Sequence, residues 1–160
     1  MGIYYLDTSA ILKRYVSEPG SAWVDALCTA RDSEGDIKSH QFVLGEIARV
    51  EVAAALTKKS VKTKEISVIE SAEAYKLFLA HLEDEYQVVS ITSERIRAAA
   101  ALARTHALRA YDAIQLALAM HANDLLKENG LGLIFVTGDK TLLQAAQDEG
   151  LTTDNPHDHP

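Results

Sequence analysis

The chain alternates between short runs of β-branched, aromatic or other apolar residues and longer stretches in which apolar residues recur every three or four positions. The short runs predict strands at Ile3–Leu6, Ile37–His40, Tyr86–Ile91, Leu131–Thr137 and Leu151–Thr153. The longer stretches predict helices at Thr8–Val16, Ser21–Ala30, Leu44–Lys59, Lys64–Leu82, Ser93–Thr105, Ala110–Leu126 and Asp139–Glu149.

Strands separated by helices usually pair in parallel, because each helix carries the chain back across the sheet. We therefore predict an α/β fold: a three-layer α/β/α domain with a parallel sheet of four or five strands. In such sheets the functional crevice lies at the carboxyl ends of the strands.

Length and composition predict a single domain. The 160 residues are 48% hydrophobic and 24% charged, which suits one substantial core. We assign residues 1–155 to this domain. Residues 156–160 are polar and contain proline, so we expect a flexible tail, in which the His157-Asp158-His159 sequence is incidental.

The sequence contains no feature of export or membrane insertion. Cys28 is the only cysteine, so no disulfide can form within the chain. The N-terminus lacks a signal-peptide pattern, and no apolar run approaches the roughly 18 residues that span a bilayer. We expect a cytoplasmic protein with no membrane partner.

The net charge of −7 excludes a protein that coats nucleic acid through bulk positive charge. A nucleic acid would have to meet local basic patches. Two candidates are Lys58, Lys59, Lys62 and Lys64, and Arg95, Arg97, Arg104 and Arg109. Runs of this kind are more often solvated helix faces, and we interpret both in that way.

Two aspartates, Asp7 and Asp139, come directly after predicted strands and open the helices that follow. Each alone is adequately explained as a helix N-cap, a role that contributes about 1 kcal/mol. Because the carboxyl ends of parallel strands meet at one edge of a sheet, both side chains should also face the functional crevice.

Two further acids lie within predicted helices. Glu51 shares the more apolar side of its helix with alanines and aliphatic residues, where an unpaired carboxylate would be unfavourable. Glu46 projects away from that side and is interpreted as solvent-facing. Asp112 lies in a first helical turn, where the helix dipole favours negative charge without any function.

Taken together, these four acids predict a cation site. Two carboxylates about 4 Å apart repel by roughly 4 kcal/mol at an effective dielectric constant of about 20, and a divalent cation offsets that repulsion. Hard oxygen ligands without a histidine or cysteine cluster favour Mg²⁺ or Mn²⁺ over zinc. Such a site is suited to phosphodiester hydrolysis with water as the nucleophile.

At these positions the sequence resembles a PIN-domain ribonuclease, specifically a VapC-type toxin of a toxin–antitoxin system. The resemblance rests on four segments in order, YLDTSA at Tyr5–Ala10, RVEVAAAL at Arg49–Leu56, YDAIQLA at Tyr111–Ala117 and VTGDKTLL at Val136–Leu143. It covers nearly the whole chain and ends at Asn155-Pro156.

The resemblance implies a function and a set of partners. Asp7, Glu51, Asp112 and Asp139 would be the catalytic, metal-binding acids, with Ser9 and Thr137 lining the site or simply forming caps and turns. It further implies Mg²⁺ or Mn²⁺ as cofactor, RNA as substrate, a homodimer, and inhibition by a small antitoxin.

Four other functions stay open. The protein could be a stand-alone RNA-processing nuclease rather than a toxin. A PIN-like module could bind RNA or protein without catalysis, its acids being structural. An aspartyl-phosphate phosphatase would want a second aspartate at the position of Ser9. A DNA-directed flap nuclease would use the same metal chemistry, but the chain has no obvious helical arch.

Overall fold

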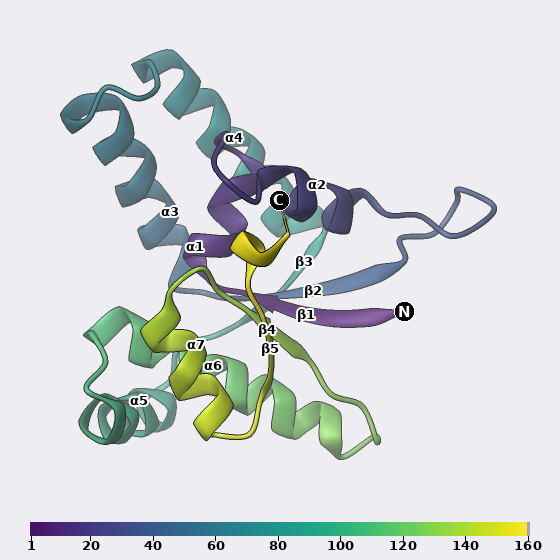
Figure 1. Ribbon diagram of the computed structural model, residues 1–160, viewed down its shortest axis with the longest axis vertical. Coiled ribbons are helices and arrows are strands. Elements are labelled where there is room, and N and C mark those ends of the chain that lie inside the picture. Colours follow the sequence, from purple (N-terminus) through teal and green to yellow (C-terminus); the bar gives the residue numbers. More distant parts are fainter. Residues whose placement is uncertain (160) are drawn as a thin grey trace.

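The computed structural model describes residues 1–159 and contains one parallel sheet between two layers of helices (Figure 1). The five strands lie in the order β3-β2-β1-β4-β5. They are β1 (Gly2–Leu6), β2 (His40–Gly45), β3 (Tyr86–Val89), β4 (Ile134–Val136) and β5 (Thr152–Asp154). The predicted α/β/α fold with a parallel sheet of four or five strands is confirmed.

Alternation along the strands divides the core in two. In β1, Ile3 and Tyr5 pack into one apolar cluster, whereas Leu6 belongs to the other. The first cluster lies under α5 (Ser93–His106), α6 (Ala110–Lys127) and α7 (Lys140–Asp148). The second lies under α1 (Thr8–Ile11), α2 (Ser21–Thr29), α3 (Ala48–Thr57) and α4 (Val68–Asp84), on the opposite face in Figure 1. Each face of the sheet is therefore covered, as a parallel sheet requires.

The prediction for the second strand was wrong. It was placed at Ile37–His40, with a helix from Leu44, but β2 runs to Gly45 and α3 begins at Ala48. Phe42, Val43 and Leu44 are all buried because β2 has a helical layer on both faces. A strand buried on both faces reads as a continuous apolar run, which periodicity cannot separate from the start of a helix.

Two helices also begin or end differently from the prediction. The helix expected over Thr8–Val16 stops at Ile11 and continues as a 3-10 turn, Leu12–Arg14. The helix expected from Lys64 begins at Val68 because Ser67 and Glu70 form a reciprocal capping box. Between α3 and α4, Lys58–Lys62 forms a π-helical turn.

Residues 156–159, which were expected to form a flexible tail, instead fold against the domain. Pro156–Asp158 form a 3-10 turn in which Pro156 is buried. His159 stacks on Trp23, with ring centroids 4.2 Å apart, and its Nε2 lies 2.8 Å from an oxygen of Asp154. Residue 160 lies outside the described residues.

The strand order creates a switch point at the centre of the sheet. The chain passes from β1 outward to β2 and β3, then returns to the other side of β1 with β4 and β5. Just beyond the two strands, the Asp7 N–H donates to the carbonyl oxygen of Val136 at 3.1 Å. Crevices at such switch points are where open α/β sheets bind ligands.

Candidate active site

The four predicted acids line one open cleft of about 570 Å³. Asp7 follows β1, Glu51 lies on α3, Asp112 lies in the first turn of α6, and Asp139 lies between β4 and α7. Two acids therefore come from the switch point and two from helices of opposite layers. Glu46 lies before α3 rather than within it, yet it is exposed, as predicted. It is not among the lining residues and accepts a hydrogen bond from the Ile91 N–H.

Asp7 is the most buried of the four acids, with 4% of its surface exposed. Its Oδ1 accepts hydrogen bonds from Ser9 Oγ at 2.7 Å and the Ala10 N–H at 2.8 Å, so it is also the N-cap of α1. Its Oδ2 accepts one from Thr137 Oγ1 at 2.6 Å. Burial raises the pKa of Asp7 to about 6, although the hydrogen bonds from Thr137 and Ser9 oppose the shift; the charge of Glu51 adds to it.

Ser9 and Thr137 were predicted to line the site through their hydroxyls. Ser9 does line the cleft, whereas Thr137 is fully buried behind it and reaches the site through its hydrogen bonds with Asp7 and Asp139. Both hydroxyls also shape the turn after β4, because the Gly138 N–H donates to Ser9 Oγ at 2.9 Å and the Asp139 N–H donates to Thr137 Oγ1 at 3.1 Å. The two residues position the acids from the strand ends.

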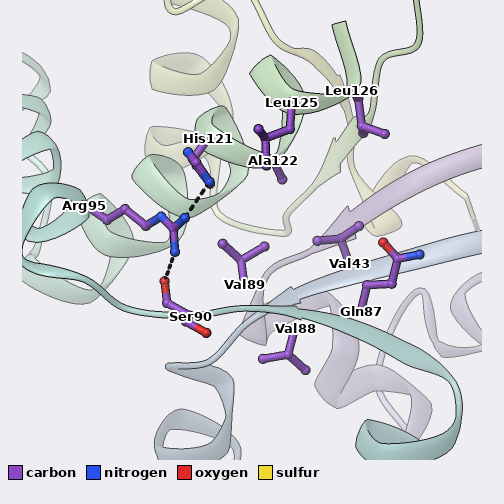
Figure 2. Close-up of a pocket in the computed structure, with 10 residues that line it drawn as sticks. All are labelled: Val43, Gln87, Val88, Val89, Ser90, Arg95, His121, Ala122, Leu125 and Leu126. Carbon is purple, nitrogen blue, oxygen red and sulfur yellow. Dashed lines mark hydrogen bonds between the residues drawn. The ribbon is translucent and has the colours of Figure 1, made fainter. Parts of the chain in front are cut away.

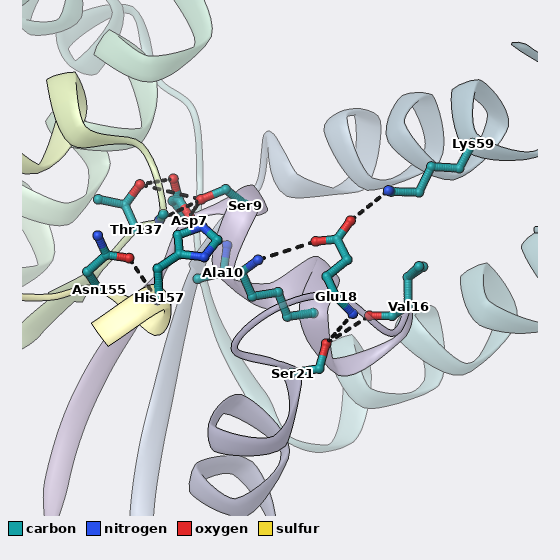
Figure 3. A network of polar contacts seen from close by, with 12 residues as sticks. Asp7, Ser9, Ala10, Val16, Glu18, Ser21, Lys59, Thr137, Asn155 and His157 are labelled. Atoms are coloured by element: carbon teal, nitrogen blue, oxygen red, sulfur yellow. Dashed lines mark hydrogen bonds and ion pairs between the residues drawn. The ribbon is translucent and has the colours of Figure 1, made fainter. Parts of the chain in front are cut away.

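The turn after β4 is closed on its other side by the C-terminal segment. Figure 3 shows the ring of His157 beside Ser9 and Thr137. A Cβ atom added to Gly138 would lie 3.0 Å from Nε2 of His157, so only glycine fits here without displacing the ring. Asp139 then caps α7 by accepting the Leu142 N–H on Oδ1 at 2.9 Å.

Glu51 is held by a polar cluster that crosses the layers. Its Oε1 accepts hydrogen bonds from Thr8 Oγ1 at 2.9 Å and Gln115 Nε2 at 2.8 Å. Gln115 is 2% exposed, and its own Oε1 accepts the Tyr5 hydroxyl at 2.7 Å. Burial raises the pKa of Glu51, and the charge of Asp112 adds to this, while the two hydrogen bonds oppose it.

Sequence reasoning missed Thr8 and Gln115 as site residues. Nothing in the sequence marks Thr8 as a site residue, because many residue types can occupy the first position of a helix after an N-cap. Gln115 does carry one: it is a polar residue within the otherwise apolar run Ala113–Met120 of α6. A buried amide in such a run has to find partners, since an unpaired one would cost about 1–3 kcal/mol.

Arg109 was interpreted as part of a solvated helix face, and that was wrong. It stands at the N-cap position of α6, and its guanidinium lies in the acid cleft. Nε donates to Asp112 Oδ2 at 2.8 Å and Nη2 to Asp139 Oδ2 at 3.3 Å. Lys59 is not a freely solvated charge either, because its side chain is only 17% exposed and pairs with Glu18 and Glu65.

The residues present fit a hard divalent cation. The lining contains four carboxylates and neither histidine nor cysteine. Among residues 1–159, no three His, Cys, Asp or Glu side chains are arranged to hold one ion as they stand. Mg²⁺, however, is usually bound through one or two carboxylates together with waters and substrate phosphates. The guanidinium of Arg109 between Asp112 and Asp139 shows that a cation is already accommodated between two of the acids.

A second cavity, of about 330 Å³, lies beside edge strand β3 (Figure 2). Arg95 crosses its rim, donating to the Ser90 carbonyl oxygen at 2.6 Å and approaching His121 Nε2 at 2.5 Å. Most of the remaining lining is aliphatic, and it includes no carboxylate. This cavity therefore has no carboxylate that could hold a divalent cation, whereas four carboxylates line the acid cleft, which we take as the candidate active site.

The fold and the acid cleft agree with the comparison with known families. The PIN domain model matches residues 4–147, and the chain belongs to the PIN domain family. No curated protein matches the sequence significantly. Among residues 1–159, no helix is long and apolar enough to cross a membrane.

Two solved structures share the fold. One is a chain in the crystal structure of VapBC2 from Rickettsia felis bound to a DNA fragment from their promoter, with a TM-score of 0.58 and 16% identity. The other is a chain of VapBC-1 from nontypeable Haemophilus influenzae, with a TM-score of 0.57 and 16% identity. Each match covers 96% of this chain and 98% of the other.

Proposed function

We propose that this protein is a metal-dependent endoribonuclease of the VapC type, the toxin of a type II toxin–antitoxin pair. The observation that carries the proposal is the convergence of Asp7, Glu51, Asp112 and Asp139 on one cleft at the switch point of a PIN-domain sheet. Membership of the family and the similarity of the fold to chains of two VapBC structures support it.

Each of the four acids would have its own role in binding the cation. Asp7 and Asp139 would bind the cation from the strand ends, with Ser9 and Thr137 fixing Asp7. Glu51, oriented by Thr8 and Gln115, would present its Oε2, which forms no hydrogen bond with the described residues. Asp112 would complete the set of acids from α6.

Mg²⁺ or Mn²⁺ bound to these acids would bind the phosphate oxygens, lower the pKa of an attacking water and stabilise the charge on the leaving 3′ oxygen. No nucleophilic serine or cysteine is then required. The cleft is open to solvent rather than closed, so a segment of a longer polymer could reach the acids.

The proposed partners follow from the similarity to VapC-type proteins. An RNA would be the substrate, and a small antitoxin would inhibit the enzyme in a cytoplasmic complex. We also propose a homodimer. The negative net charge of −7 would favour an antitoxin segment rich in basic residues.

The test is cleavage of a mixed RNA pool by purified protein in Mg²⁺, in Mn²⁺ and in EDTA. We expect cutting with either metal and none in EDTA. Asp7→Asn and Glu51→Gln should each reduce the rate on the order of 100-fold or more, because each removes a negative charge that stabilises the cation.

Glu46→Gln is the matched control, since Glu46 lies outside the cleft, and it should cleave at the wild-type rate. Equal loss in Glu46→Gln and Glu51→Gln would refute the site assignment. Folded wild-type protein that binds RNA but cuts none of it with either metal would instead support a non-catalytic binding module.

A further inference from the structure

Arg109 is the one basic side chain that forms ion pairs with the acids of the cleft among residues 1–159. It bridges two elements, because Asp112 belongs to α6 and Asp139 precedes α7. The guanidinium therefore occupies a position between two acids that the proposed function assigns to a divalent cation. A guanidinium and a divalent cation held by the same carboxylates would repel each other, so binding of one would weaken binding of the other.

The position of Arg109 is not required by packing. Its side chain is 77% exposed and contacts the cleft through its charged head. Exposed ion pairs of this kind contribute little to stability. The Arg109 side chain can thus leave the acids with little loss of folding stability, while its backbone stays fixed at the start of α6.

A displaced guanidinium would remain at the mouth of the cleft. The planar group presents parallel N–H donors that match two phosphate oxygens, and it keeps its charge at any physiological pH. Lys58 also lines the cleft, but an ammonium group acts on phosphate only as a point charge. The best phosphate ligand in the cleft is therefore the group that neutralises the acids.

We propose that Arg109 is a built-in counter-cation that competes with the divalent cation for Asp112 and Asp139 and, once displaced, binds a backbone phosphate of the RNA. The proposal rests on the proposed function and adds to it an order of binding events. The cation must first replace the guanidinium, and the freed guanidinium then helps to hold the substrate. Removing Arg109 should consequently strengthen metal binding and weaken cleavage.

The first measurement is the Mn²⁺ affinity in the absence of RNA, from the free Mn²⁺ signal in electron paramagnetic resonance. Arg109→Gln should lower the Mn²⁺ dissociation constant about three- to tenfold, the effect of removing one unit charge beside a solvent-screened cation site. Arg109→Lys should stay closer to wild type because it keeps the charge. Arg104→Gln, an exposed arginine of α5 with no ion pair among residues 1–159, should change the constant less than twofold.

The second measurement is RNA cleavage at saturating Mn²⁺. Arg109→Gln should be at least about tenfold slower, and Arg109→Lys should also be slower, because lysine lacks the two-pronged contact. Opposite changes in metal affinity and in rate are the signature of the proposal, since a merely structural role would weaken both. Circular dichroism establishes that each variant is folded.

The outcomes separate this inference from the proposed function. Unchanged or weaker Mn²⁺ binding by folded Arg109→Gln overturns the competition, even if wild-type protein cuts RNA. Mn²⁺ binding that neither Asp7→Asn nor Asp139→Asn weakens overturns the metal site itself, and with it the proposed function. A wild-type rate in Arg109→Gln at saturating Mn²⁺ overturns the phosphate contact.

Discussion

Gln115 illustrates how a neutral side chain can fix the geometry of a charged one. Its amide has one defined orientation, because the Glu51 carboxylate can only accept: Nε2 therefore faces Glu51 and Thr8, and Oε1 accepts the Tyr5 hydroxyl. The Glu51 carboxylate is thereby turned with Oε1 inward. A ligand carboxylate with one oxygen engaged by the protein has fewer orientations to lose when it binds a cation.

Replacing Gln115 should therefore affect the reaction more than the fold. We expect Gln115→Leu to lower the cleavage rate about 10–100-fold, as is typical when a group that orients a metal ligand is removed. The free energy of unfolding should fall by about 1–3 kcal/mol, because the buried Tyr5 hydroxyl loses its partner. Steady-state cleavage and urea unfolding measure the two effects.

Tyr5→Phe is the companion variant, since it removes the hydrogen bond that the Tyr5 hydroxyl donates to Gln115 Oε1 but leaves the amide in place. Its activity should lie between those of wild type and Gln115→Leu. A wild-type cleavage rate in folded Gln115→Leu would show that Glu51 needs no support from this cluster.

These contacts also explain which site residues the sequence could reveal. Asp7 and Asp139 are visible because the end of a strand is a local feature of the chain. The roles of Gln115 and Arg109 depend on partners far away, 64 residues separating Gln115 from Glu51 and 30 separating Arg109 from Asp139. A single sequence shows that these residues are polar but not which groups they meet.

Among the elements, β2 decides how closely the two helical layers meet at the cleft. It ends at Gly45, where an added Cβ would lie 2.5 Å from the Tyr5 hydroxyl oxygen and 2.7 Å from Cδ1 of Leu118. The Gln115 Oε1 atom would be 3.3 Å away. Glycine at the end of β2 thus lets α6 approach the sheet closely enough for Gln115 to reach Glu51.

Gly45→Ala should therefore act on the site through packing. We expect a loss of about 1–3 kcal/mol in the free energy of unfolding, the usual effect of an extra methyl group in a filled core, together with slower cleavage. The matched control is Gly132→Ala, where the nearest side-chain atom would be 3.7 Å from the new Cβ. Thermal unfolding and cleavage of both variants test this, and equal stability of the two would contradict it.

The boundaries of β2 are also where prediction from the sequence failed. The order of strands and helices, and hence the parallel sheet, follows from local apolar patterns. The exact limits of β2 do not, because its residues are buried by helices that come much later in the chain, such as α6. The end of the chain is a similar case, since Pro156 is ordered by α2 rather than by its own sequence.

For the molecule as a whole, the acid cleft opposes folding when no cation is bound. Asp7 joins the sheet to both helical layers, yet burial raises its pKa from 3.8 to about 6. Between those two pH values the folded protein holds a proton that the unfolded chain has released. The free energy of unfolding contributed by Asp7 therefore falls as the pH rises through about 4 to 6, and the shift of about 2 units corresponds to about 3 kcal/mol.

Asp7→Asn removes this titration, so in EDTA the variant should gain stability over wild type as the pH rises. The difference in free energy of unfolding should grow by up to about 3 kcal/mol between pH 4 and pH 7, as measured by urea denaturation. Asp25→Asn, which replaces an exposed aspartate of α2, is the control and should follow wild type.

Adding Mn²⁺ at pH 7 should then reverse the order of the two proteins, because a ligand that binds only the folded state stabilises it by mass action. Wild type should gain stability with increasing Mn²⁺, whereas Asp7→Asn should gain much less. If the free energies of unfolding of the two proteins depend on pH in parallel in EDTA, burial does not raise the pKa of Asp7. If they respond equally to Mn²⁺, the cation binds elsewhere.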